Sequence, residues 1–227
     1  MKDSKEELAN IQELFNQGKY TEVQPLLKDY LSKHADSQLA YKLYGNVLAY
    51  NGYLNKARVV WRYALKKYPE NTDILYNLAL SGVVSGKKSK IYLKKLLDIT
   101  PEDTDAISML AQIAKDEGNY KLAIKYWKQC LEIQPDKVEI MNNIGVSYAI
   151  LTNYGQACVW YKKAIEIDNN YALAHFNLAT ALYEIGELKE SLDNAEKAME
   201  LDPTTHAPQA LSLIRQIKKR LDIKINN

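Results

Sequence analysis

Three histidines and two cysteines are the side chains of this 227-residue chain best suited to acid–base, nucleophilic or metal-binding chemistry. They are His34, His175, His206, Cys130 and Cys158. The histidines are scattered, the cysteines lack metal-ligand spacing, and no HExxH, GxSxG, P-loop or dinucleotide-binding motif occurs. The sequence therefore predicts that the chain is not an enzyme, with no catalytic residue, no bound metal and no cofactor.

The two cysteines fall within segments of helical pattern and form no CxxC pair, so we expect buried, reduced thiols. Reduced thiols, and a start from Met1 to Glu7 without an apolar signal core, favour the cytoplasm; a removed leader or anchor stays open. No run of about 18 apolar residues occurs, which argues against direct membrane insertion. The 30 basic and 28 acidic side chains nearly balance, which argues against nucleic acid as a partner.

Glycine and proline recur at a long interval. The glycines are separated by 34, 34, 32 and 68 residues, and the prolines by 32, 34 and 68. These residues are Gly18, Gly52, Gly86, Gly118 and Gly186, and Pro69, Pro101, Pro135 and Pro203. A turn glycine and a helix-ending proline at this period indicate stacked helical hairpins. We expect one domain over 1–227, with repeats at 4–37, 38–71, 72–103, 104–137, 138–171 and 172–205 and a capping helix over 206–223.

Two repeats depart from this period. In the fifth repeat, Thr152 stands where the turn glycine is expected. The third repeat is short, because Gly86 to Pro101 is 15 residues whereas the other turn-to-proline intervals are 17. Two residues are therefore missing near 87–89, and we expect a tightened turn and a local change of superhelical pitch there.

Apolar residues within each repeat follow helical spacing. In the fifth repeat, Met141, Ile144, Gly145 and Tyr148 stand at i, i+3, i+4 and i+7, which is one face of an α-helix. Small residues recur where two helix backbones approach closely, and large side chains fill the space beside them. The small residues are Gly45, Ala79, Ala111, Gly145 and Ala179, then Ala57, Ala123, Ala157 and Ser191, and the large ones are Trp61, Leu93, Trp127 and Tyr161.

The second and fifth repeats carry the clearest motif. The second reads Tyr41-x2-Tyr44-Gly45-x2-Leu48, Gly52, Ala57-x3-Trp61-x2-Ala64 and Pro69, and the fifth reads Met141-x2-Ile144-Gly145-x2-Tyr148 and Ala157-x3-Tyr161-x2-Ala164. This pattern resembles the tetratricopeptide repeat, W-x2-L-G-x2-Y followed by A-x3-F, A and P. The resemblance covers nearly the whole chain. It implies an all-α, right-handed α-solenoid of about six hairpins plus a C-terminal capping helix, and it specifies a fold but no activity.

The resemblance also implies that one stripe of each first helix lines a concave groove, where a non-catalytic scaffold or adaptor binds a protein or peptide partner. Apolar side chains on this stripe form two patches with the polar fourth repeat between them, and uncovered apolar patches often mark partner sites. Val83 and Val84 belong to the first patch or fill space left by the short turn. The predicted groove residues are Lys42, Asn46, Tyr50, Tyr76, Asn77, Leu80, Asn142, Asn143, Val146, Phe176, Asn177 and Tyr183.

Asparagines at the sixth repeat position add a second signal. Asn77, Asn143 and Asn177 occur there, and a carboxamide can both donate to and accept from the backbone of an extended peptide. Related tetratricopeptide proteins that bind extended peptides use such a ladder, and here Leu43 and Met109 interrupt it. The consensus itself is also rich in asparagine, so a scaffold role stays open.

A carboxylate clamp, as in cochaperones of this family, is disfavoured. Three of its five positions match, at Lys42, Asn46 and Asn77. The two remaining basic positions hold Asp105 and Met109, and an aspartate there would repel a carboxylate ligand.

Two alternatives of other classes stay open. In one, the chain is a self-assembling structural module whose imperfect first repeat docks on another copy through exposed Leu8, Ile11 and Leu14. In the other, the chain is a regulatory array within a larger enzyme or a membrane-anchored assembly factor.

Overall fold

The chain is built from α-helices. The computed structural model describes residues 2–82, 86–204 and 207–225, which form thirteen helices and no strand. In chain order they are α1 (Lys2–Asn16), α2 (Tyr20–Lys33), α3 (Gln38–Tyr50), α4 (Leu54–Lys67), α5 (Thr72–Ser81), α6 (Gly86–Ile99), α7 (Thr104–Asp116), α8 (Tyr120–Ile133), α9 (Val138–Ile150), α10 (Tyr154–Ile167), α11 (Ala172–Ile185), α12 (Leu188–Leu201) and α13 (Ala207–Ile225). The predicted all-α architecture is confirmed.

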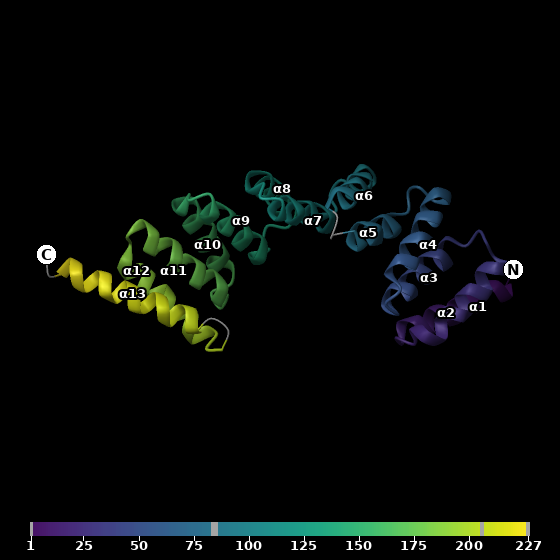
Figure 1. Cartoon of the computed structure of the whole chain (residues 1–227), viewed down its shortest axis with the longest axis horizontal. Coiled ribbons are helices and arrows are strands. Elements are labelled where there is room, and N and C mark those ends of the chain that lie inside the picture. The colour runs from purple at the N-terminus through teal and green to yellow at the C-terminus, as the bar shows by residue number, and fades with distance from the viewer. Residues whose placement is uncertain (1, 83–85, 205–206, 226–227) are drawn as a thin grey trace. The chain divides into compact units, whose positions relative to one another are not determined.

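The helices group into two compact halves, residues 1–106 and residues 107–227. In the N-terminal half, each helix from α1 to α6 packs on the next, and α1 also packs on α3 (Figure 1). In the C-terminal half, the helices from α8 to α13 follow the same rule, and α9 also packs on α11. Contacts between sequence neighbours and between successive first helices are those of a solenoid. The single domain over residues 1–227 stays a prediction.

Small residues allow the two helices of a hairpin to approach closely. Gly45 faces the indole of Trp61, and Gly145 faces the ring of Tyr161, so that a Cβ at either glycine would lie within 3.0 Å of three ring atoms. Two buried serines also allow the helices of a hairpin to approach closely, and each adds a hydrogen bond between the two helices. Ser89 Oγ donates to the carbonyl of Ala79, and Ser191 Oγ donates to the carbonyl of Ala179, each at 2.7 Å. The repeat pattern identified Ser191 but missed Ser89.

In the third hairpin, the predicted role of Gly86 as a turn residue is wrong. Gly86 is not a turn residue like Gly52, because it is the first residue of α6. Ser89 follows Ala79 by 10 residues, whereas the Ser191 hydrogen bond spans 12, so the missing residues come from the connection before Ser89. Helix α5 is accordingly 10 residues long and α3 is 13. Val83 and Val84 lie outside the described residues.

In the first repeat, the predicted exposure of the apolar side chains of α1 differs from the structure. Ile11 is buried in a core cluster with Val23 and Leu27 of α2, and Leu8 and Leu14 are partly buried against the same cluster. Because α1 packs on both α2 and α3, Ile11 is covered within the chain, and its expected exposure is wrong. Docking of a second copy on the first repeat stays a prediction.

Thr152 takes the turn conformation that glycine takes elsewhere. Its φ is +57°, beside values of +75° to +88° at Gly18, Gly52, Gly118 and Gly186. A β-branched residue in this region is strained. Replacing Thr152 with glycine is therefore expected to raise the free energy of unfolding by about 1 kcal/mol, measured by urea denaturation. Gly118→Thr is the reverse control and should destabilise; a stabilised Gly118→Thr or a destabilised Thr152→Gly contradicts the prediction.

Both cysteines are buried, as expected. Cys130 lies in α8 and Cys158 in α10, and they are not joined in a disulfide. Burial raises the pKa of the Cys158 thiol, with a smaller opposing effect from the charge of Lys162. A raised pKa keeps this thiol protonated and unreactive at neutral pH.

Candidate functional site

A pocket of about 360 Å³ lies between α3, α4 and α5. Four of the predicted groove residues line it, namely Asn46 and Tyr50 from α3 and Asn77 and Leu80 from α5. Helix α4 closes it with Arg58 and Trp61. We call this site the apolar pocket. Its first-helix residues come together because α3 and α5 belong to successive hairpins that pack through α4.

Two asparagines form the polar part of the apolar pocket. Asn77 Nδ2 donates to Asn46 Oδ1 at 2.8 Å. This bond fixes both carboxamides and leaves Asn46 Nδ2 and Asn77 Oδ1 without a partner among the described residues. One donor and one acceptor, held side by side, match the two polar groups of a peptide backbone.

Leu80 and Tyr50 supply the apolar surface. Leu80 is 54% exposed and Tyr50 is 63% exposed, and both line the same pocket. Tyr50 is nevertheless held in place, because its ring stacks on Tyr20 at 4.5 Å between centroids and lies 6.0 Å from Phe15. The apolar surface is therefore accessible and positioned before any partner arrives.

Trp61 forms the buried wall of the apolar pocket. Its side chain is nearly inaccessible, and its indole N–H has no hydrogen-bond partner among the described residues. The indole nitrogen lies against Gly45, where the missing Cβ leaves room for the ring. Trp61 is thus a core residue with one edge on the pocket, in agreement with its interpretation as a packing anchor.

Two further predicted residues lie outside the lining of the apolar pocket. Lys42 Nζ pairs with a carboxylate oxygen of Asp73 at 2.7 Å, so its charge is partly compensated. Tyr76 is half-buried, and burial raises the pKa of its hydroxyl, with smaller contributions from Asp105 and Asp103. The ion pair with Asp73 therefore leaves Lys42 less available to a carboxylate ligand than a clamp requires.

In the C-terminal half, the predicted asparagines form a second pair. Asn177 Nδ2 donates to Asn142 Oδ1 at 2.8 Å. Asn142 is only 4% exposed, so this pair leaves little surface for a partner. Asn143 is half-buried, and its backbone carbonyl accepts a hydrogen bond from Ser147. Val146 is partly buried against the cluster around Tyr161.

Phe176 and Tyr183 are partly covered by the C-terminal helix. Both pack against the core cluster that α11 and α12 share with α13. The guanidinium of Arg220 lies 5.0 Å from the Tyr183 ring centroid, and Arg220 also donates to the Tyr183 carbonyl at 2.9 Å. These rings therefore contribute to the docking of α13.

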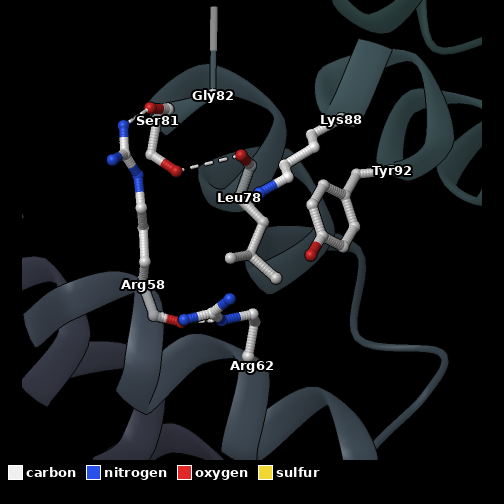
Figure 2. A pocket seen from close by; sticks show the side chains of 7 residues that line it. All are labelled: Arg58, Arg62, Leu78, Ser81, Gly82, Lys88 and Tyr92. Atoms are coloured by element: carbon white, nitrogen blue, oxygen red, sulfur yellow. Dashed lines mark hydrogen bonds between the residues drawn. The ribbon is translucent and has the colours of Figure 1, made fainter. Parts of the chain in front are cut away.

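A second pocket, of about 280 Å³, lies between α4, α5 and α6, and we call it the basic pocket. Figure 2 shows Arg58 extended along one side toward Ser81, with Arg62 at the base and Lys88 and Tyr92 opposite. The sequence interpretation missed these residues. A signal was present, because Arg58 and Arg62, and likewise Lys88 and Tyr92, stand four residues apart on one helix face.

The side chains considered first for chemistry do not converge on either pocket. His175 is buried, with Nδ1 2.9 Å from Asn194 Oδ1 and Nε2 3.1 Å from the carbonyl of Asn169. His34 packs on the Tyr30 ring, and His206 lies outside the described residues. Over the residues that the structure describes, no group of three potential ligands is placed to hold a metal ion, and no helix is long and apolar enough to cross a membrane.

Known proteins resemble this chain in sequence and in structure. A family model described as TPR repeat matches residues 148–186, and family models described as tetratricopeptide repeat match residues 104–137 and 172–205. The chain is similar to the protein CTR9 homolog of Arabidopsis thaliana, with 26% identity over 202 residues, which are 83% of this chain and 18% of that protein. The chain spans between 17% and 44% of the length of the first curated relatives it matches.

Solved structures share the fold. A tetratricopeptide repeat protein from Parabacteroides merdae covers 97% of this chain and 88% of its own length, with a TM-score of 0.72 and 19% identity. YrrB, described as a TPR protein with an unusual peptide-binding site, covers 85% of this chain and 97% of its own length, with a TM-score of 0.68 and 20% identity.

Proposed function

Because the chain belongs to the tetratricopeptide repeat family, we propose that it binds an extended or helical segment of a partner protein, with the apolar pocket as the main contact. Tetratricopeptide repeats are interaction modules, and YrrB is described as having a peptide-binding site. The proposal assigns the chain no catalytic role, no cofactor and no nucleic-acid partner. It takes the cytoplasm as the place of action.

One observation carries this proposal. Exposed Leu80 and Tyr50 lie beside one amide donor and one carbonyl acceptor that the Asn46–Asn77 bond holds in place. An apolar side chain of the partner would gain free energy by leaving water here, while its backbone satisfies the two amide groups. A site that is ordered before binding loses less entropy on association.

The most direct test replaces Leu80. Peptides would be selected from a phage-displayed library on the immobilised full chain, and their Kd measured by fluorescence polarisation. Leu80→Asp is expected to raise Kd at least about tenfold, because it places a charge where the partner buries apolar surface. Leu80 is exposed, so the circular dichroism at 222 nm should not change.

Val59→Asp is the matched control, because Val59 is 58% exposed on α4 but does not line the apolar pocket. Equal Kd values for wild type and Leu80→Asp, or an equal loss with Val59→Asp, would exclude the apolar pocket as the binding site. Phe176 and Tyr183 are less suitable for this test, since their replacement also disturbs the docking of α13.

A second candidate is a regulatory array within a longer protein. The observation that favours it is the small share of the curated relatives' length that this chain spans. The apolar pocket would then receive a segment of the same polypeptide or of a bound subunit. The full open reading frame separates the two candidates.

A further inference from the structure

We infer that the basic pocket binds an oxyanion, a carboxylate or a phosphate, carried by the partner segment that occupies the apolar pocket. This inference rests on the proposed function for the origin of the anion, while the anion site itself rests on separate residues. The ligand class follows from charge, from the contacts of each cation and from the position of the pocket.

Three cationic side chains line the basic pocket, and none has an acidic partner among the described residues. Arg58 donates to Asn55 Oδ1 and to the carbonyl of Ser81, and Arg62 Nε donates to the carbonyl of Arg58. No ion pair of Lys88 occurs within the described part of the chain. By contrast, other lysines of this chain pair with acids, as Lys42 does with Asp73.

Because these contacts of the cations are with uncharged groups and use few of their N–H groups, hydrogen-bond donors remain available for a ligand. Among the described residues, Arg62 donates only from Nε, so both of its terminal nitrogens can donate to one oxyanion in a forked arrangement. Lys88 adds up to three donors and Tyr92 adds a hydroxyl. The contact of Arg58 with Ser81 holds its guanidinium at the edge of the pocket. The described lining residues include no carboxylate, so none of these side chains carries a charge that would repel an anion.

The two pockets adjoin, because Arg58 and Ser81 line both of them. A peptide that places an apolar side chain beside Leu80 therefore has the basic pocket within reach of a neighbouring residue. The near balance of 30 basic and 28 acidic side chains over the whole chain argues against an extended polyanion as the ligand. An acidic or phosphorylated residue next to an apolar one fits this arrangement best.

The cations also differ from those expected of a carboxylate clamp. Arg58 and Arg62 lie on α4 and Lys88 lies on α6, which are second helices of their hairpins. The clamp positions suggested by resemblance were on first helices, where Lys42 is paired with Asp73. The cations of the basic pocket therefore lie outside the clamp positions that the family pattern predicts.

The first experiment tests the anion site alone. Inorganic phosphate is titrated into the ¹⁵N-labelled full chain at constant ionic strength, and the side-chain Nε–H signals of Arg58 and Arg62 are followed by NMR. We expect saturable shifts of both signals in the wild type, and their loss in Lys88→Glu. Lys28→Glu, an exposed lysine of α2 with the same change of charge, should retain them. The absence of saturable shifts, or their persistence in Lys88→Glu, overturns the inference.

The second experiment identifies the source of the anion. The probes are acetyl-Ser-Leu-Ser-Glu-Ser-amide and its analogues with glutamine or phosphoserine in place of glutamate. The Arg62→Glu/Lys88→Glu variant and the glutamine analogue should each weaken binding at least about tenfold, because charge-assisted hydrogen bonds are lost. Tighter binding of the phosphoserine probe than of the glutamate probe assigns the site to phosphate, and the reverse order assigns it to carboxylate.

The two proposals fail in different ways. If the glutamine analogue binds as tightly as the charged probes, this inference is wrong, while an effect of Leu80→Asp still supports the proposed function. If phosphate shifts the arginine signals but Leu80→Asp has no effect on any peptide, the anion site stands and the proposed groove function is wrong.

Discussion

Gly145→Ala is expected to lower the free energy of unfolding by about 2–3 kcal/mol, measured by urea denaturation at 222 nm. The added Cβ would lie within 3.0 Å of three ring atoms of Tyr161. That ring is buried, so it can only yield by moving the helix that carries it. The helix propensity of alanine offsets only about 1 kcal/mol of this loss. Gly45→Ala, which would press on Trp61, is expected to behave in the same way.

Two comparisons make this prediction specific. Gly155→Ala is the control, because Gly155 lies in α10 and a Cβ added there would have no described neighbour within 4 Å. It should not destabilise the chain. In the second comparison, Gly145→Ala is combined with Tyr161→Leu, which copies the Ala79 and Leu93 pair of the third hairpin. The double variant should lose less than the sum of the single variants. A neutral Gly145→Ala would show that the hairpin is not closely packed at this point.

Trp127→Ala is expected to cost about 3–5 kcal/mol of unfolding free energy. Trp127 is 1% exposed and packs with Ala111, Ala123 and Ile144. Removing its indole leaves a cavity between three helices that the packed backbone cannot close. Circular dichroism during urea unfolding measures the loss without depending on tryptophan fluorescence.

Trp160→Ala is the matched control for this cavity. Trp160 is half-buried, and Lys163 Nζ lies 4.5 Å from its ring centroid. We expect a loss of no more than about 2 kcal/mol, because part of the indole already contacts water. If the two variants lose equal stability, the sequence period does not distinguish core tryptophans from surface ones.

The sequence predicted the helices and their packing contacts because both are local and repeated. Helix positions follow from apolar residues at i, i+3, i+4 and i+7. The close approach at Gly45 and Gly145 follows from a small residue at the same place in successive repeats. Each repeat therefore provides independent evidence for the same contact. Where the pattern is weak in one repeat, the other repeats still predict the contact.

The predictions failed at positions where a shorter connection, or a neighbouring helix that covers the side chain, makes one repeat differ from the others. The glycine period places Gly86 in a turn, whereas the packing of Ser89 against Ala79 sets the register of α6. The weak first repeat predicts an exposed Ile11, although α2 and α3 cover it. The groove pattern predicts an open Tyr183, although Arg220 of α13 lies over its ring. In each case, the deciding contact comes from another helix.

The sequence by itself determined that this chain is an all-α tetratricopeptide repeat protein, and it identified Asn46, Tyr50, Asn77 and Leu80 as candidates for binding. Only the tertiary structure placed these four around one pocket and set the basic pocket of Arg58, Arg62 and Lys88 beside it. The physical reason is that a repeat pattern records what each helix buries against its neighbours. A pocket depends instead on side chains from three helices that share no pattern, and on how far apart those helices hold them.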